Sequence, residues 1–185
     1  MRTNKKHQLL TFAIAIVEAK GLDALTYDSL AQASGFSKSG LIYHFPSRDA
    51  LLLDINTHLA QCWEEEMIAY AGGRAEEVSF HTRVHACFST MSASATRAEL
   101  RMSLDAATNP ALSSPWLDVF DRWGVPIKMV EENPDLYLFQ ILADGLWVHD
   151  HINGVKLSPT QRTQLIERAL AIFDEYIEPK TKEKS

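Results

Sequence analysis

The chain has little cysteine and no long hydrophobic run, and each absence excludes a class of protein. Its 185 residues include two cysteines, Cys62 and Cys87, which lack the spacing of a Cys-x-x-Cys or Cys/His metal site. We therefore expect two buried, reduced thiols rather than a disulfide or a redox pair. No apolar stretch has the length of a membrane span, and the polar N-terminus does not fit a signal peptide. These absences predict a cytoplasmic protein.

The sequence also lacks the alternation of apolar and polar residues that marks half-buried strands. Apolar residues instead recur at helical spacing, as Leu9, Phe12, Ala13, Ile16 and Val17 do. This first helix should end after residue 20. Further helices are expected at about 27–34, 38–44, 48–70, 76–94, 97–108, 114–132, 135–150 and 159–177. A Gly-Val-Pro sequence at 124–126 should interrupt the helix expected over 114–132. We predict an all-α fold without internal repeats.

Positive charge is scarce, with a formal net charge of −6 at pH 7, which argues mildly against a nucleic-acid partner. The charge is unevenly distributed, however, because residues 1–50 carry +2 and residues 51–185 carry −8. Any DNA-binding surface should therefore lie near the N-terminus. Since +2 is a weak bias, affinity would depend on bringing two such segments to one duplex, and on backbone amides and hydroxyls as much as on cations.

Two short helices joined by a glycine-containing turn are predicted within residues 25–45. Thr26 can cap the first helix, and Gly35 can end it because glycine adopts left-handed backbone at little cost. Ser37 can cap the second helix, which a following proline limits to about residues 38–44. This is the pattern of a helix-turn-helix motif, whose second helix enters the major groove of DNA.

Residues 26–51 resemble the N-terminal domain of tetracycline-repressor (TetR-type) transcription regulators, and the resemblance extends over about residues 3–63. It rests on the capped first helix, the Gly-x-Ser-Lys turn, the Tyr-His-Phe end of the second helix and the Pro-Ser-Arg-Asp-x-Leu start of the next. In one departure, Ile42 follows the leucine of the second helix where the family usually has an aromatic residue, and the aromatic comes at Tyr43.

The resemblance implies two domains. A three-helix helix-turn-helix DNA-binding domain is expected over residues 1–47, continuing into a connecting helix over 48–70. A larger helical domain for ligand binding and dimerisation is expected over residues 48–178. A Lys/Glu-rich tail over residues 179–185 should be frayed.

Motif position and side-chain chemistry select the residues expected to contact DNA. Lys38 and Ser39 should reach base edges, while Ser37 and Gly40 allow close approach because they are small. Phosphate contacts are expected from five residues: Thr26, Tyr27, Tyr43, His44 and Arg48.

The last two helices carry more apolar residues than one core face needs, which predicts a homodimer with a four-helix interface, as the resemblance also implies. The alternative is that both helices bury these residues in the core of one chain. In the dimer, the two recognition helices should lie about 34–36 Å apart to bind a palindromic operator. The expected interface residues are Leu138, Ile141, Leu142, Gly145, Leu165, Ile166, Ala169, Leu170 and Phe173.

The middle of the chain is rich in large, adaptable side chains that suit a small apolar or aromatic effector. Core packing is the alternative for each of them, and the expectation of a pocket depends partly on the resemblance. The candidate ligand-binding residues are Trp63, Met67, Phe88, Met91, Met102, Trp116, Phe120 and Trp123.

His81 and His85 are four residues apart on one expected helix, a spacing that metal sites use, and residues 144–151 also hold several ionisable groups. The sequence justifies no third or fourth ligand, so we expect no metal site and no cofactor. The sequence has neither a nucleophile paired with a base nor a phosphate-binding glycine loop, so we do not expect an enzyme.

These features together predict a ligand-responsive transcriptional regulator, most simply a repressor, although an activator would use the same residues. The alternative from another class is a helical small-molecule-binding or scaffolding protein without specific DNA binding.

Overall fold

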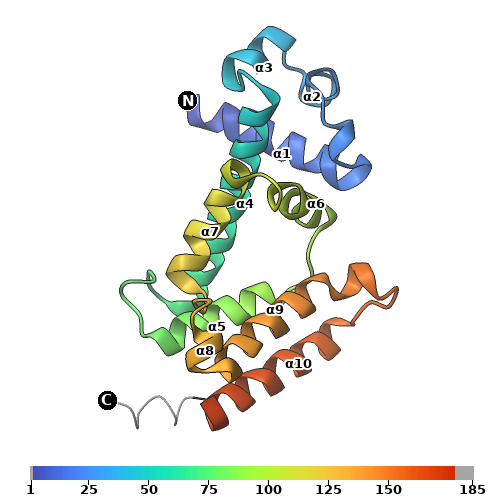
Figure 1. Ribbon diagram of the computed structural model, residues 1–185. Helices are drawn as coiled ribbons and strands as arrows, with labels where there is room; N and C mark the ends of the chain where they lie inside the picture. The colour runs from blue at the N-terminus through green and yellow to red at the C-terminus, as the bar shows by residue number, and fades with distance from the viewer. Residues whose placement is uncertain (1, 178–185) are drawn as a thin grey trace. The chain divides into compact units, whose positions relative to one another are not determined.

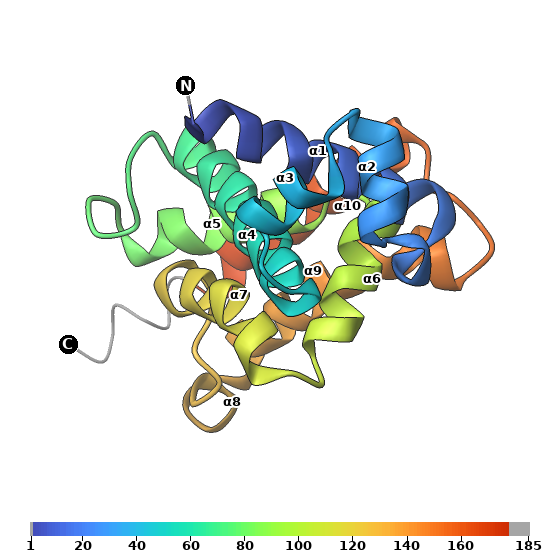
Figure 2. The same ribbon diagram turned by 90° about the horizontal axis from the view of Figure 1, so that it is seen from above.

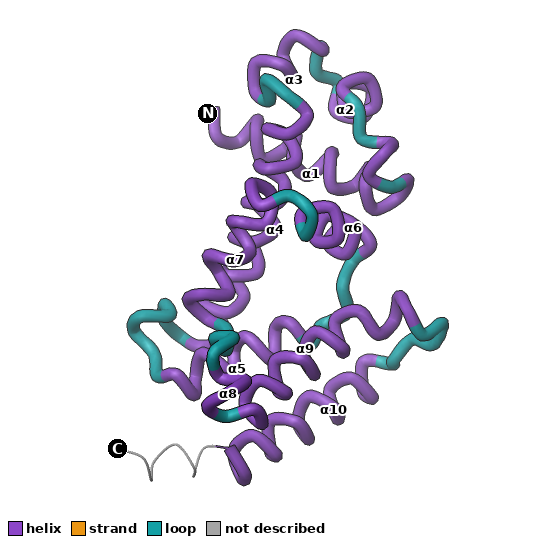
Figure 3. The backbone as a smooth tube through the Cα atoms, viewed as in Figure 1, coloured by secondary structure: helices purple, strands orange, loops and turns teal. Residues whose placement is uncertain are grey.

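The computed structural model describes residues 2–177, except for the side chains of residues 2–4, 176 and 177, and every regular element in this range is helical (Figures 1 and 3). This confirms the all-α fold. The expected frayed tail over residues 179–185 lies outside the described residues. The elements are α1 (Arg2–Lys20), η1 (Leu22–Ala24), α2 (Tyr27–Ser34), α3 (Lys38–His44), α4 (Arg48–Ala71), α5 (Phe80–Met91), α6 (Arg97–Ala106), α7 (Pro110–Trp123), α8 (Met129–Glu132), α9 (Pro134–Ile152), α10 (Pro159–Ile172) and η2 (Phe173–Ile177).

Most helix starts coincide with the capping signals in the sequence. The hydroxyl of Thr96 accepts the backbone N–H of Glu99, whose carboxylate in turn accepts the N–H of Thr96, and Ser158 and Gln161 form the same reciprocal pair at the start of α10. These caps satisfy N–H groups that have no partner inside their helix. The starts of α6 and α10 were therefore predicted correctly.

The start of α5 differs from its expected place near residue 76. Ser79 caps this helix by accepting the N–H of Thr82 at 3.1 Å, so α5 begins at Phe80. The preceding residues form a separate turn, in which the carboxylate of Glu77 accepts the N–H of Arg74 at 2.8 Å. A serine cap and a glutamate-closed turn thus replace the first helical turn that periodicity suggested.

The start of α7 also differs, because the helix begins at Pro110 and not at residue 114. The side chain of Asn109 accepts the N–H of Ala111 at 3.1 Å, and proline suits the first helical position because that N–H needs no partner. Pro115 then lies inside the helix. The carbonyl of Ala111 is the one that an N–H at position 115 would reach, and it accepts the hydroxyl of Ser114 at 3.4 Å instead. The expected break after residue 123 is confirmed, and only residues 129–132 continue as the short helix α8.

The chain forms two compact units. The first comprises the described part of residues 1–62 and residues 96–117, and the second comprises residues 63–95 and the described part of residues 118–185. Helices α4 and α7 therefore contribute residues to both units. The functional division expected at residue 47 stays a prediction.

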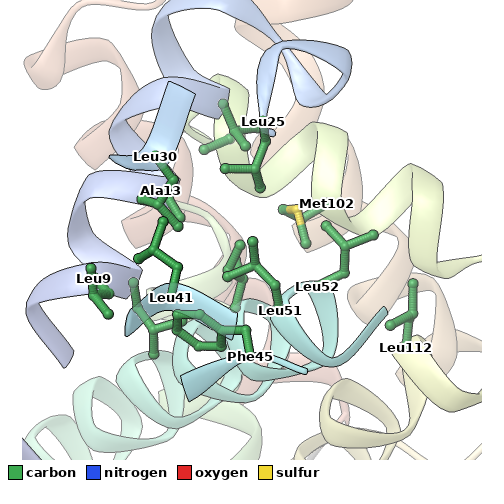
Figure 4. Close-up of a cluster of buried hydrophobic side chains, with 14 of the residues drawn as sticks. Leu9, Ala13, Leu25, Leu30, Leu41, Phe45, Leu51, Leu52, Met102 and Leu112 are labelled. Carbon is green, nitrogen blue, oxygen red and sulfur yellow. The ribbon is translucent and has the colours of Figure 1, made fainter. Parts of the chain in front are cut away.

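In the first unit, α1 packs against α2 and α6 around one hydrophobic core (Figure 4). Figure 2, seen from above, shows α3 beside the first turns of α4. Of the apolar residues expected on the inner face of α1, Leu9, Ala13 and Val17 are completely buried, whereas Phe12 is 40% exposed. The buried core residues are Leu9, Leu10, Ala13, Val17, Leu25, Leu30, Leu41, Phe45, Leu51, Leu52, Ile55, Ala98, Met102, Ala106 and Leu112.

In the second unit, α5 packs against α9 and α10. The rings of Phe88 and Phe139 stack at a centroid distance of 3.9 Å, and Phe173 of η2 lies 5.0 Å from Phe139. No helix among the described residues is both long and apolar enough to cross a membrane.

Candidate nucleic-acid interface

The turn between α2 and α3 has the geometry that the sequence predicted. Thr26 and Ser29 form a reciprocal cap at the start of α2, with hydrogen bonds of 3.0 and 2.9 Å. Gly35 ends the helix with φ of 74°, a left-handed conformation that most side chains disfavour, and its N–H donates to the carbonyl of Ala31 at 2.9 Å. Cap and glycine together fix the direction in which the chain enters α3.

Helix α3, the recognition helix, is held by buried residues on its inner face. Leu41 and Phe45 are both fully buried. The hydroxyl of Tyr27 donates to the carbonyl of Phe45 at 2.6 Å and so ties the start of α2 to the end of α3. Burial raises the pKa of Tyr27. The recognition helix is therefore positioned by packing and by one partly buried hydrogen bond.

The outer face of the recognition helix is exposed. Its exposed residues include Lys38 and Ser39 at the start of the helix. Further along, Ile42 is 47% exposed and Tyr43 is 63% exposed. At the first turn, the Ser37 hydroxyl accepts the N–H of Gly40 at 3.2 Å and lies 3.1 Å from the Ser39 hydroxyl. A Cβ atom at Gly40 would lie 3.2 Å from the Ser37 hydroxyl oxygen, closer than ordinary van der Waals contact. Any larger residue at this position would therefore press against the Ser37 side chain. Small polar groups thus surround the start of the helix.

Lys38 is paired with an acid of the preceding helix. Its ammonium group lies 2.9 and 3.1 Å from the two carboxylate oxygens of Asp28, and both side chains are largely exposed. An exposed ion pair contributes only about 0–1 kcal/mol, so a phosphate or a base edge can replace Asp28 at small cost. The sequence prediction did not include this pair.

The expected phosphate-contacting residues surround the recognition helix without forming one cluster. Thr26 and Arg48 are exposed at the starts of α2 and α4, and Arg48 donates to the carbonyl of Leu22 at 3.4 Å. The ring of His44 is half-buried with its centroid 5.4 Å from that of Tyr43. The hydroxyl proton of Tyr27 is already donated within the unit. The phosphate contacts of these residues stay predictions.

An open polar hollow lies beside the end of the recognition helix, and the sequence prediction missed it. It brings residues of α1 and α4 together with Tyr43 and His44 of the recognition helix. Lys6 on its wall pairs with Asp54 at 2.8 Å. The lining residues are Lys6, His7, Leu10, Tyr43, His44, Asp54, Thr57, His58 and Gln61.

The candidate ligand-binding residues are divided between the two units. Met102 is fully buried in the core of the first unit. Trp116 is half-buried there, where its indole N–H donates to Asn56 at 2.9 Å. The other six residues belong to the second unit. Their role in ligand binding stays a prediction.

Within the second unit, two aromatic residues of the candidate set contact each other and a third is bonded to an acid. Trp63 contacts Phe120 at a centroid distance of 5.0 Å, and the buried Trp123 donates to the carboxylate of Glu64 at 3.0 Å. Arg122 forms two hydrogen bonds of 2.7 Å to the same carboxylate. The Arg122 bond is the main reason that the pKa of Glu64 is lowered, and burial opposes it.

The second unit also brings Gln140 and Asp144 beside the buried thiol of Cys87, a contact that the sequence did not predict. Cys87 and Gln140 line a cavity of about 10 Å³, large enough for no more than about one water molecule. Burial raises the pKa of Cys87 to about 12, and burial also raises the pKa of Asp144, whose carboxylate accepts from Gln140 at 3.3 Å. Both cysteines are reduced, as expected, but only Cys87 is buried, whereas Cys62 is half-buried.

The apolar residues of the last two helices fall into two groups. Ala169 and Phe173 are buried in the core of the second unit, and Ile166 and Leu170 pack against that core. The remaining residues leave an apolar surface, with exposures of 62%, 50%, 46% and 46% for Leu138, Ile141, Leu142 and Leu165, and Gly145 is exposed among them. Core packing thus accounts for the first group only.

Two family models match the chain, and together they cover most of it. Residues 9–55 match the model of bacterial regulatory proteins of the tetR family. Residues 81–174, half of the chain, match the model of the tetracyclin repressor-like C-terminal domain. No curated protein sequence matches significantly.

Several solved structures share the fold at low sequence identity. A protein from Saccharomonospora viridis, described as a transcriptional regulator and solved with choline, is 16% identical with a TM-score of 0.67, and the match covers 94% of this chain and 97% of that one. The multidrug-binding protein EbrR, solved with imidazole, is 17% identical with a TM-score of 0.58, covering 89% and 94%. A TetR-family regulator from Mesorhizobium loti is 14% identical with a TM-score of 0.60, covering 92% and 95%.

Proposed function

Since this chain belongs to the tetracycline-repressor family and is a ligand-responsive, DNA-binding transcriptional regulator, we propose that it is a repressor that binds a palindromic operator as a homodimer. The observation that carries the proposal is the recognition helix, which is anchored by Leu41 and Phe45 and exposes Lys38 and Ser39. Lys38 and Ser39 contact base edges, and Ser37 and Gly40 permit close approach.

Phosphate contacts hold the recognition helix in register. Arg48 and Thr26 supply them from the exposed starts of two helices, and Tyr43 and His44 supply them from the end of the recognition helix. Tyr27 contributes by positioning, because its hydroxyl already donates to the carbonyl of Phe45.

Dimerisation supplies the second recognition helix. The apolar surface that Leu138, Ile141, Leu142 and Leu165 leave on the second unit supports an isologous interface with the same surface of a second chain. Two recognition helices about one DNA turn apart then compensate for the small positive charge of each.

A small organic effector binds the second unit and weakens operator binding. Choline and imidazole, with which two related structures were solved, are small and nitrogen-containing, and the aromatic residues Trp63, Phe120 and Trp123 would suit such a ligand. Helix α4 contributes residues to both units and is the element through which the effector would act. A coupling of about 1–3 kcal/mol corresponds to a roughly 5- to 150-fold loss of operator affinity.

Regulators of this family are in general not enzymes, and we propose the same for this chain. We also propose that the protein acts in the cytoplasm, where it would meet its operator DNA. The rival function, a helical small-molecule-binding or scaffolding protein, keeps the helix-turn-helix motif only for packing.

Replacing Lys38 separates the two functions. In a mobility-shift titration with the duplex that the protein enriches from random DNA, Lys38→Ala should weaken binding by about 1–3 kcal/mol and relax the preference at one base position. Lys20→Ala removes the same charge from the exposed end of α1 and should bind like the wild type. Equal affinities of Lys38→Ala and wild type would contradict the proposed base contact. The absence of salt-dependent, sequence-specific binding by the wild type would favour the rival function.

A further inference from the structure

Three potential metal ligands from two separate elements meet in the second unit. His81 and His85 lie one turn apart on α5, and Asp174 lies in η2 at the other end of the sequence. The Nε2 atoms of His81 and His85 are 2.9 and 2.7 Å from the same carboxylate oxygen of Asp174. One coordinating atom from each residue lies within 4.8 Å of the other two. Asp174 is the third ligand that the sequence alone did not supply.

The two imidazoles are held in place by a buried aromatic ring. The ring centroids of His81 and His85 are 4.2 Å apart. They lie 5.4 and 5.3 Å, respectively, from the ring centroid of Phe173, a residue that is only 2% exposed. The His85 side chain is 16% exposed and that of His81 is 35% exposed, so an ion from solvent can reach the site. The side chains therefore converge on one accessible point before any ion binds.

The three groups are of the kinds that bind zinc. Without an ion, a neutral imidazole can donate to Asp174 in the tautomer that carries its proton on Nε2. In the other tautomer the proton is on Nδ1, so each Nε2 lone pair can bind a divalent ion beside the carboxylate, and imidazole and carboxylate are common ligands of zinc.

We propose that His81, His85 and Asp174 bind one divalent first-row transition-metal ion, such as Zn²⁺, with water in the fourth position of a tetrahedral site. Bonds of about 2.0–2.2 Å at tetrahedral angles place ligand atoms roughly 3.3 Å apart. The present nitrogen-to-oxygen distances of 2.9 and 2.7 Å must therefore open by about half an ångström, which the exposed side chain of Asp174 allows. The ion would link α5 to η2. This proposal is independent of the operator and of the organic effector.

Metal titration of the tag-free full-length chain tests the site. We expect one Co²⁺ per chain, with the visible absorption of a four-coordinate ion that Zn²⁺ displaces, and a rise in melting temperature with added Zn²⁺. Asp174→Asn and His85→Ala should each weaken binding at least roughly 10- to 100-fold, since even outer partners of metal ligands have effects of that size. His149→Gln removes a histidine of the same unit that pairs with Asp150, and it should bind metal like the wild type.

Circular dichroism of the metal-free variants should show that each remains helical. Failure of the wild type to bind one ion per chain would overturn the proposal. Equal metal affinity in Asp174→Asn, His85→Ala and the wild type would overturn it as well. Operator binding is measured separately, so neither result depends on the proposed repressor function.

Discussion

At the residue scale, two side chains of the candidate nucleic-acid interface already have partners within the chain. Lys38 is paired with Asp28, and the hydroxyl of Tyr27 is bonded to the carbonyl of Phe45. The sequence predicted that both residues belong to the motif, since their positions follow from the caps at Thr26 and Ser37. It did not predict either partner, because both bonds join residues at least ten positions apart.

Removing the acid that pairs with Lys38 should strengthen DNA binding. Asp28→Asn frees the ammonium group and removes a negative charge near the phosphates, while the loss of an exposed ion pair costs only about 0–1 kcal/mol of stability. Fluorescence anisotropy with labelled operator should show tighter binding at low salt. Asp23→Asn removes one exposed acid elsewhere in the same unit and is the matched control. Weaker binding by Asp28→Asn would mean that the pair positions Lys38 for DNA.

The hydroxyl of Tyr27 should matter for stability more than for direct phosphate contact. Tyr27→Phe keeps the ring and removes the bond to the carbonyl of Phe45, so the free energy of unfolding should fall by about 0.5–1.5 kcal/mol in a urea titration. Operator affinity should change little under conditions where the variant is fully folded. A large loss of affinity with unchanged stability would assign the hydroxyl to phosphate instead.

At the element scale, helix ends with a side-chain cap were the most predictable feature. The second, third, sixth and tenth helices begin where Thr26, Ser37, Thr96 and Ser158 indicate, because a cap is a local interaction over three residues. The predicted start of α7 was wrong because the sequence contains two prolines that could each occupy the first turn of the helix. The side chains of Asn109 and Ser114 favour Pro110 there and accommodate Pro115 inside the helix.

Asp150 stabilises the connection between α9 and α10. Its carboxylate accepts the backbone N–H of Leu157 at 3.1 Å and lies 3.0 Å from Arg162. The bond from Leu157 is the main cause that lowers the pKa of Asp150 to about 2. Since the folded pKa is below the unfolded one, this stabilisation is present above about pH 4 and is lost as the pH falls toward 2.

Asp150→Asn should therefore lower the melting temperature at pH 7 and bring it closer to that of the wild type near pH 2. Melting followed by circular dichroism across this range measures the difference. Asp105→Asn, in α6 of the first unit, is the control for the loss of one acid. A difference in melting temperature that does not shrink between pH 4 and 2 would contradict the role of the ionised carboxylate.

At the scale of the whole molecule, the proposed function requires two chains. The sequence identified the surplus of apolar residues on the last two helices but could not divide it. Division requires the fold, which buries Ala169 and Phe173 in the second unit and leaves Leu138 and Ile141 exposed. The sequence indicated His81 and His85 by their spacing but not the third proposed metal ligand, since Asp174 is 89 residues from His85.

Placing a charge on the exposed apolar surface should dissociate the dimer without unfolding the chain. Leu138→Glu alters a side chain that is 62% exposed, whereas Leu104→Glu alters one that is 65% exposed in the first unit and serves as the control. Light scattering coupled to size exclusion should give a dimer for the wild type and for Leu104→Glu, and a monomer for Leu138→Glu. Operator affinity should fall with dimer content. A dimer that withstands Leu138→Glu would place the interface elsewhere.

If the protein is a dimeric repressor, two copies of the recognition helix bind neighbouring major grooves of one duplex. Selection of bound sequences from random duplex DNA by the wild-type protein tests this arrangement most directly. We expect enrichment of an inverted repeat whose half-sites are centred about one helical turn, roughly 34–36 Å, apart. Recovery of no enriched sequence, or of a single unrepeated site, would contradict it.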